Sequence, residues 1–173
     1  MPGRRDAEFT EFVQVRLGAL RRVAFLLARD WDRADDIVQA AITKLYVHWN
    51  RAQGDGHAEA YARAIVVREF LSEQRSGWAR RVSLAAEVPD RAAAASDHAA
   101  VLDVRSALGA LPSGQRATLV LRFYCDLSVG QAAEALGCSE GTVKSQTAKG
   151  LQALRRALED GDSARTLGST ERV

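Results

Sequence analysis

Apolar residues recur at helical spacing from the start of the chain. Phe9, Phe12, Leu20 and Leu27 fall on one face of a helix, because that face repeats about every 3.6 residues. The pattern predicts one or two opening helices that end near Asp30.

A second amphipathic helix is predicted to begin at Asp32, whose side chain is suited to cap a helix N-terminus. Asp35 and Asp36 would lie in the first turn, where the helix dipole favours negative charge. The apolar stripe of this helix consists of Ile37, Ala41, Leu45 and Trp49. Four apolar residues on one stripe predict a helix of roughly four turns with one buried face.

Residues 50–57 are rich in Gly, Asn and Asp, which predicts a loop. A third helix is expected from about Ala58, with Tyr61, Ile65 and Phe70 on its apolar side. Its other side carries several arginines, and the helix is expected to end near Arg75.

Helical periodicity fades over residues 77–99, where Pro89 breaks any helix and a run of alanines follows. Periodicity returns between Val101 and Leu111, and Pro112 is expected to end that helix and begin the next. The residues after 158 are polar and aperiodic, which predicts a disordered tail over residues 159–173.

The predicted fold class is therefore all-α, with two small helical domains joined by a flexible linker. The predicted boundaries are 5–76 for the first domain, 77–99 for the linker and 100–158 for the second domain. The linker contains little that could pack into a core, so the two domains are expected to move freely relative to each other.

The segment LSVGQAAEALGCSEGTVKSQTAKGLQAL, residues 127–154, predicts a helix-turn-helix. Ser128 can cap the first helix, Gly137 suits a left-handed turn, and Ser139 can cap the second helix. The inward stripe of the second helix is expected to contain Val143, Thr147, Leu151, Leu154 and Leu158.

The outward face of this second helix carries hydroxyls, amides and lysines over its first turns. Such groups reach base edges and phosphates in the major groove, which favours DNA binding. The alternative is an ordinary helical hairpin with a solvated face. The candidate DNA-contacting residues are Ser139, Thr142, Lys144, Ser145, Gln146 and Lys149.

The composition, with 47% hydrophobic and 27% charged residues among 173, is typical of a globular protein. The formal net charge is only +2, but the charge is distributed unevenly. Residues 30–36 are acidic, whereas residues 76–83 and 144–156 carry basic residues without acidic ones. The two ends of the chain are therefore expected to face different partners.

No metal-binding spacing accompanies Cys125 and Cys138, and the sequence offers no nucleophile with a nearby base and no phosphate loop. We therefore expect no enzymatic activity and no cofactor. The N-terminus lacks the apolar run of a signal peptide, and no apolar stretch reaches the ~18 residues of a membrane span. The expected location is cytoplasmic, without membrane insertion.

Three segments in order resemble the extracytoplasmic-function (group IV) sigma factors of bacterial RNA polymerase, in the style of an actinobacterial sigma-E-like subfamily. DRADDIVQAAITKLYVHW is similar to the polymerase-binding helix of the family, and IVVREFLSEQRSGWARRVSL to the segment that reads the −10 element. LPSGQR, LVLRFY and GTVKS occur in the order and spacing of the C-terminal domain that reads the −35 element.

The resemblance implies that the protein binds core RNA polymerase, through its β′ clamp helices and β flap, and promoter DNA. It also implies an anti-sigma factor as a further partner. The implied polymerase-binding residues are Asp35, Asp36, Ile37 and Gln39. The implied −10 contacts are Arg63, Arg68, Arg75, Trp78, Arg80 and Arg81, although Trp78 could equally cover the core. The helix-turn-helix residues given above would contact the −35 element.

The chain departs from the family pattern at three positions. Arg68 stands where the family often has asparagine, Ala40 where it usually has glutamate, and Gln146 where arginine is frequent. The alternative function is a stand-alone helix-turn-helix regulator whose N-terminal unit senses a ligand or dimerises. A docking strip at Asp36 and Gln39, rather than a ligand pocket, would favour the sigma factor.

Overall fold

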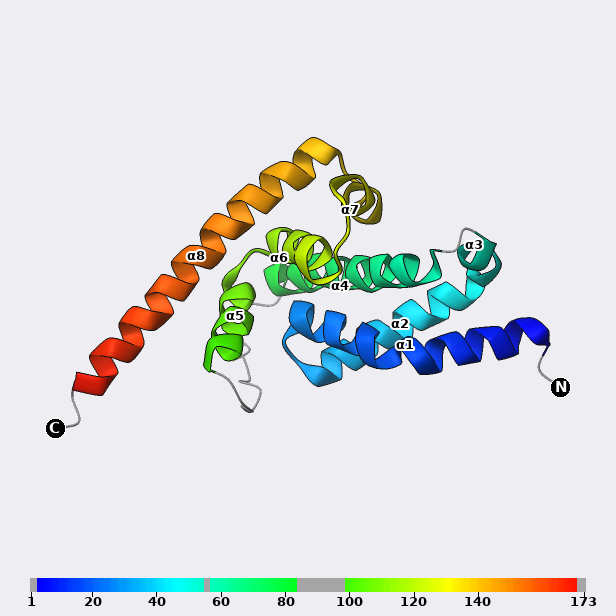
Figure 1. The fold of residues 1–173 in the computed structure, drawn as a ribbon, viewed down its shortest axis with the longest axis horizontal. Coiled ribbons are helices and arrows are strands. Elements are labelled where there is room, and N and C mark those ends of the chain that lie inside the picture. The colour runs from blue at the N-terminus through cyan, green and yellow to red at the C-terminus, as the bar shows by residue number, and fades with distance from the viewer. Residues whose placement is uncertain (1–2, 55–56, 84–98, 171–173) are drawn as a thin grey trace.

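The structure is a computed structural model that describes residues 3–54, 57–83 and 99–170. Every regular element in these ranges is a helix, which confirms the predicted all-α fold class (Figure 1). The N-terminal unit contains α1 (Arg4–Ala28), α2 (Trp31–Val47), α3 (Trp49–Gly54) and α4 (Ala58–Ser83). The C-terminal unit contains α5 (Ala99–Ala110), α6 (Ser113–Leu119), the π-helical turn η1 (Val120–Tyr124), α7 (Val129–Leu136) and α8 (Glu140–Thr170).

The N-terminal unit is built on α1, α2 and α4, which pack against one another. The turn between α1 and α2 places Arg29 in the left-handed region, with φ 59°. Asp30, rather than the predicted Asp32, caps α2, because its carboxylate accepts the backbone N–H of Arg33 at 2.8 Å. The cap therefore lies two residues earlier than expected.

The core of this unit is formed by the apolar faces that the periodicity indicated. Leu27, Val38, Leu45 and Phe70 are buried, and each comes from one of the three long helices. Trp49 closes one end of the core, with its ring 5.2 Å from that of Phe9. Ion pairs join the outer edges, such as Lys44 with Glu69 at 2.5 Å.

The helix-turn-helix is formed by α7 and α8, and its caps are confirmed. Ser128 accepts the backbone N–H of Gln131 at 3.1 Å, and the Gln131 side chain accepts the Ser128 N–H at 2.8 Å. Gly137 has φ 65°, the left-handed conformation that lets α7 end abruptly. Ser139 accepts the N–H of Thr142 at 3.1 Å at the start of α8.

We expect Gly137→Ala to lower the free energy of unfolding by about 1 to 2 kcal/mol. The added methyl group would meet no atom within 4 Å, so the cost comes from the left-handed backbone alone. Urea denaturation measures this change. Gly114→Ala is the control, because that glycine also has open space but no positive φ. Equal stability of the two variants would contradict the argument.

The inward face of α8 differs from the prediction at one position. Val143 is buried, but Leu151 is 44% exposed and Gly150 takes its place. A Cβ at Gly150 would lie only 3.1 Å from Leu119 Cγ, so the glycine lets α8 approach α6 closely. Gly150 follows Val143 by seven residues and so shares its face, whereas Leu151 is turned away by about 80° at 100° per residue.

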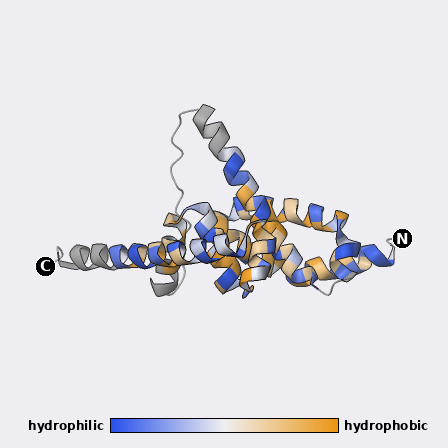
Figure 2. Cartoon of the chain, turned by 90° about the horizontal axis from the view of Figure 1, so that it is seen from above, coloured by the Kyte–Doolittle hydropathy of each residue, from blue (hydrophilic) through white to orange (hydrophobic). Residues whose placement is uncertain are grey.

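The two units pack against each other, which differs from the expected free movement. α4 packs against α6 and α7, and α1 packs against α5 and η1. One cluster of buried residues continues from Phe70 in the first unit to Leu121 and Ala132 in the second. Figure 2 shows the apolar residues gathered in the middle of the molecule, where helices of both units meet.

Two predicted boundaries also lie elsewhere. α4 continues to Ser83, seven residues beyond the predicted end of the first domain, and residues 84–98 of the predicted linker lie outside the described residues. α8 continues to Thr170, where a disordered tail was expected. The chain from residue 159 to 170 contains no proline, the strongest helix breaker, and α8 continues through the two glycines of this segment.

Candidate nucleic-acid interface

The first turns of α8 present a polar face to solvent, as predicted. Thr142, Lys144, Ser145 and Lys149 are exposed, and Gln146 is half-buried. The Ser139 hydroxyl is also exposed, but it lies 2.9 Å from the Thr142 hydroxyl and caps the helix. The face therefore offers two ammonium groups, hydroxyls and part of one amide over two helical turns.

The four predicted polymerase-binding residues at the start of α2 differ in their surroundings: two are freely exposed, and two are held by contacts within the fold. Asp36 and Gln39 are exposed one turn apart on the same helix face. Asp35 instead accepts both a 2.6 Å and a 3.0 Å hydrogen bond from Arg21 of α1, and this carboxylate raises the pKa of Arg21. Ile37 is buried in the core. Of the four predicted residues, two thus lie together on the surface.

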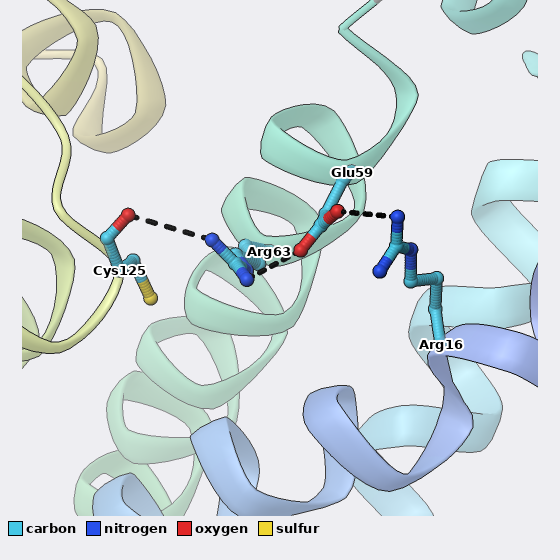
Figure 3. A network of polar contacts seen from close by, with 4 residues as sticks. All are labelled: Arg16, Glu59, Arg63 and Cys125. Atoms are coloured by element: carbon cyan, nitrogen blue, oxygen red, sulfur yellow. Dashed lines mark hydrogen bonds and ion pairs between the residues drawn. The ribbon is translucent and has the colours of Figure 1, made fainter.

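Two of the α4 arginines, Arg63 and Arg68, contact the C-terminal unit. Arg63 is half-buried and pairs with Glu59, which also contacts Arg16 at 3.1 Å. Arg63 donates as well to the backbone carbonyl of Cys125 in the C-terminal unit, at 3.4 Å (Figure 3). Burial raises the pKa of the Cys125 thiol to about 11, so this thiol stays protonated at neutral pH.

Arg68 makes two hydrogen bonds to the C-terminal end of α7. Its Nε donates to the carbonyl of Ala135 at 2.6 Å, and its Nη2 donates to the carbonyl of Glu134 at 2.9 Å. Arg75 lies two turns further along α4 and is exposed. Trp78, Arg80 and Arg81 belong to the same helix, but their side chains lie outside the described part of the chain.

A cavity of about 540 Å³ lies where α3 and α4 face α7. The N-terminal unit lines it with three alanines and with Arg51, His57, Tyr61 and Arg68. The C-terminal unit contributes the polar Gln131 and Glu134 and two apolar residues. Arg51, His57 and Tyr61 were not among the predicted site residues. Their segment reads as a loop and the start of a helix, so no local pattern marks them.

Arg116 of α6 is a further residue that the sequence analysis missed. Its guanidinium donates to the carbonyls of Leu27, Gly109 and Leu111, and it lies 5.8 Å from the Phe70 ring. A contact to backbone carbonyls leaves no sequence signal, because every residue type supplies the acceptor.

Among the residues that the structure describes, no group of His, Cys, Asp or Glu could hold a metal ion. No helix in the described ranges is long and apolar enough to cross a membrane.

Comparison with known proteins identifies both units. Residues 12–80 match Sigma-70 region 2, and residues 102–154 match Sigma-70, region 4. The chain is 34% identical to the RNA polymerase sigma-E factor of Streptomyces avermitilis, over 95% of this chain and 93% of that protein. It is 35% identical to the sigma-E factor of Streptomyces coelicolor, with 95% and 94% covered.

Two further proteins are similar. The ECF RNA polymerase sigma factor SigL of Mycobacterium tuberculosis is 30% identical over 82% of this chain and 83% of that one. The sigma factor RpoE of Bartonella quintana, solved with the anti-sigma factor NepR, has the same fold with a TM-score of 0.75. It is 24% identical and the match covers 88% of this chain and 97% of that one.

The region 2 match accounts for the N-terminal unit, so a ligand-sensing unit in front of a stand-alone helix-turn-helix is no longer needed to explain it. In the described ranges every regular element is a helix, and the exposed surfaces of α2 and α8 carry opposite charge. Region 2 is followed by region 4, and the sigma-E relatives match over nearly their whole length. The chain belongs to the extracytoplasmic-function sigma factors, which bind core RNA polymerase and direct it to specific promoters to initiate transcription.

Proposed function

We propose that three surfaces of the chain divide the work of promoter recognition: the α2 pair Asp36 and Gln39, the arginines of α4, and the outward face of α8. The observation that carries this proposal is the separation of charge. The α2 pair is exposed and acidic, whereas the α8 face and α4 carry exposed or partly exposed cations.

The α2 pair is assigned to the β′ clamp helices of core polymerase. An exposed carboxylate and amide on a rigid helix can steer and orient a partner that carries complementary charge. Asp35 supports this surface by holding Arg21 against α2, and Ile37 supports it from the core. These two residues position the helix that carries the α2 pair. The polymerase is a cytoplasmic enzyme, so the protein acts in the cytoplasm.

The arginines of α4 are assigned to the −10 element. Arg68 and Arg75 are seven residues apart on one helix face, a spacing that can follow a single-strand backbone. Tyr61 and His57 of the same unit line a cavity together with Arg68. An aromatic wall with polar groups is what a base out of the stack requires. Trp78, Arg80 and Arg81 extend the same assignment to the last turns of α4.

The outward face of α8 is assigned to the −35 element, with α8 as the recognition helix in the major groove. Lys144 and Lys149 are the cations of this face. The remainder of the C-terminal unit is assigned to the β flap. The Bartonella sigma factor was solved with an anti-sigma factor, and we assign a partner of that class to this chain as well.

Run-off transcription with purified core polymerase and a library of genomic fragments tests the proposal. Defined transcripts should appear only when the protein is added to the core enzyme. The promoters recovered should share two sequence elements at −10 and −35. Transcripts that depend on the protein but share a single element would contradict the division into two DNA-reading surfaces.

Lys144→Ala and Lys149→Ala are each expected to weaken binding to promoters recovered in that assay. A lysine that contacts phosphate should lower the slope of log affinity against log salt by about one unit, with sequence preference unchanged. A lysine that contacts a base should relax preference at one position by about 1 to 3 kcal/mol. Fluorescence anisotropy across a salt series separates the two results.

Arg156→Ala is the matched control for the two lysines, because Arg156 is an exposed cation on the same helix two turns beyond Lys149. The affinity of this variant for promoter DNA should stay close to that of the unmodified protein. If all three variants bind alike, the polar face of α8 is only solvated.

A further inference from the structure

The interface between the two units uses the same arginines that the proposed function assigns to the −10 element. Arg63 and Arg68 extend from α4 and donate to backbone carbonyls of the C-terminal unit. Both therefore have protein partners at positions that DNA phosphates or bases would otherwise occupy. Promoter DNA and the C-terminal unit cannot bind the same N–H groups at once.

Arg68 makes the more specific of these contacts, because it caps a helix of the other unit. The last carbonyls of a helix lack partners within the helix, and its C-terminal end carries partial negative charge. Arg68 supplies two N–H donors and a full positive charge to that end of α7. Hydrogen bonds from a charged donor are stronger than those between neutral groups.

A second arginine, extending from the C-terminal unit, also holds the two units together. Arg116 of the C-terminal unit donates to the carbonyl of Leu27, the penultimate residue of α1, and lies over the ring of Phe70. A guanidinium from each unit thus binds backbone carbonyls of the other. The apolar residues between them belong to one continuous core.

We propose that α7 is an internal competitor of the −10 strand, and that Arg68 is the latch that holds it against α4. The proposal rests on the assignment of the α4 arginines to the −10 element. The closed chain still exposes Asp36, Gln39 and the lysines of α8. Closure therefore blocks only the −10 surface. The chain can dock on polymerase and bind the −35 element while it is closed, but it must open before it can bind the −10 element.

This arrangement gives a physical reason for the departure at position 68. An asparagine, common there in the family, has a shorter side chain with one amide group. It cannot supply two diverging charged donors to the carbonyls of Glu134 and Ala135. Arg68→Asn is therefore a natural test of the latch, because it keeps a polar residue on the DNA-facing side.

Glu134→Lys opens the latch from the other unit. Glu134 is exposed on α7 and lines the cavity that Arg68 and Arg51 also line, so a lysine there repels two cations. The matched control is Glu11→Lys, which makes the same change in net charge at an exposed position of α1. The probe is a fluorescein-labelled single strand of 12 nucleotides with random sequence, added to the full chain.

We expect Glu134→Lys to bind the single strand about tenfold more tightly than Glu11→Lys does. Apparent affinity falls in proportion to the fraction of chains that are binding-competent, so opening a mostly closed chain raises it. The comparison removes the general effect of added positive charge. Equal affinities of the two variants would overturn competition between α7 and DNA.

A distance measurement supplies the second readout. Spin labels at Ser72→Cys and Ser145→Cys, in a Cys138→Ser background, report the separation of α4 and α8. Both label sites are exposed, and Cys125 is buried as a protonated thiol. The distribution should be narrow without further substitution and with Glu11→Lys. It should broaden toward longer distances with Arg68→Asn and Glu134→Lys.

The two readouts separate failure of the latch from failure of the proposed function. Unchanged distances in both latch variants would show that Arg68 does not hold the units together. Broadened distances without a gain in single-strand affinity would overturn the competition, and with it the assignment of the α4 arginines to DNA. Transcription by the unmodified protein in the run-off assay would stand in either case.

Discussion

Replacing Asp36 with arginine and Gln39 with alanine is expected to lower affinity for core polymerase by at least about thirtyfold. The substitution reverses the charge and removes the amide on the exposed α2 face. Neither side chain belongs to the buried core, so the helical content should stay unchanged. Pull-down with core enzyme, followed by a fluorescence titration, measures the loss.

The chain provides a matched control on a neighbouring helix. Glu11 and Gln14 of α1 are also an acid and a glutamine three residues apart, and both are exposed. Glu11→Arg with Gln14→Ala therefore makes the same chemical change elsewhere on the N-terminal unit. We expect it to keep normal affinity for core polymerase. A loss of equal size in both variants would indicate an effect of net charge and contradict the α2 assignment.

The second large effect concerns the shared core. Phe70→Ala is expected to lower the free energy of unfolding by about 3 to 5 kcal/mol, since it removes a fully buried aromatic ring. The ring also lies under the Arg116 guanidinium, so the cavity opens at the contact between the units. Urea denaturation followed by circular dichroism measures the change.

Leu151→Ala is the control for Phe70→Ala. Leu151 is exposed on α8, so its truncation should change the free energy of unfolding by no more than about 0.5 kcal/mol. A small effect at Phe70, similar to that at Leu151, would show that the core across the two units contributes little in solution.

The shared core also predicts a single unfolding transition for the unmodified protein. All three tryptophans, Trp31, Trp49 and Trp78, belong to the N-terminal unit, whereas circular dichroism reports helices of both units. The unfolding curve from tryptophan fluorescence and the curve from circular dichroism should coincide if the units unfold together. Separate midpoints would indicate two independent domains.

The sequence predicted the local features of this fold well, because local physical chemistry decides them. Ser128, Gly137 and Ser139 act at the ends of α7 and α8 as expected, since caps and left-handed turns depend on neighbouring residues. The exposed lysines of α8 follow from the helical period in the same way. Family membership also followed from three motifs in order.

The features that the sequence did not predict depend on tertiary contacts. Asp30 and Asp32 are both good caps, and the left-handed turn at Arg29 decides between them. Gly150 replaces Leu151 on the inward face because α6 approaches α8 closely there. The closed arrangement rests on arginines that bind backbone carbonyls. Because every residue type has a backbone carbonyl, the sequence does not show which ones act as acceptors.

The long sequence separation of the Arg68 contact has a consequence during protein synthesis. Arg68 and Ala135 are 67 residues apart. At the usual 5 to 20 residues per second, α7 leaves the ribosome roughly 3 to 13 seconds after α4. Until then the arginine face of α4 has no competitor within the chain. Each newly made molecule therefore passes through an open form first, and the closed form begins only when the second half of the chain has been translated.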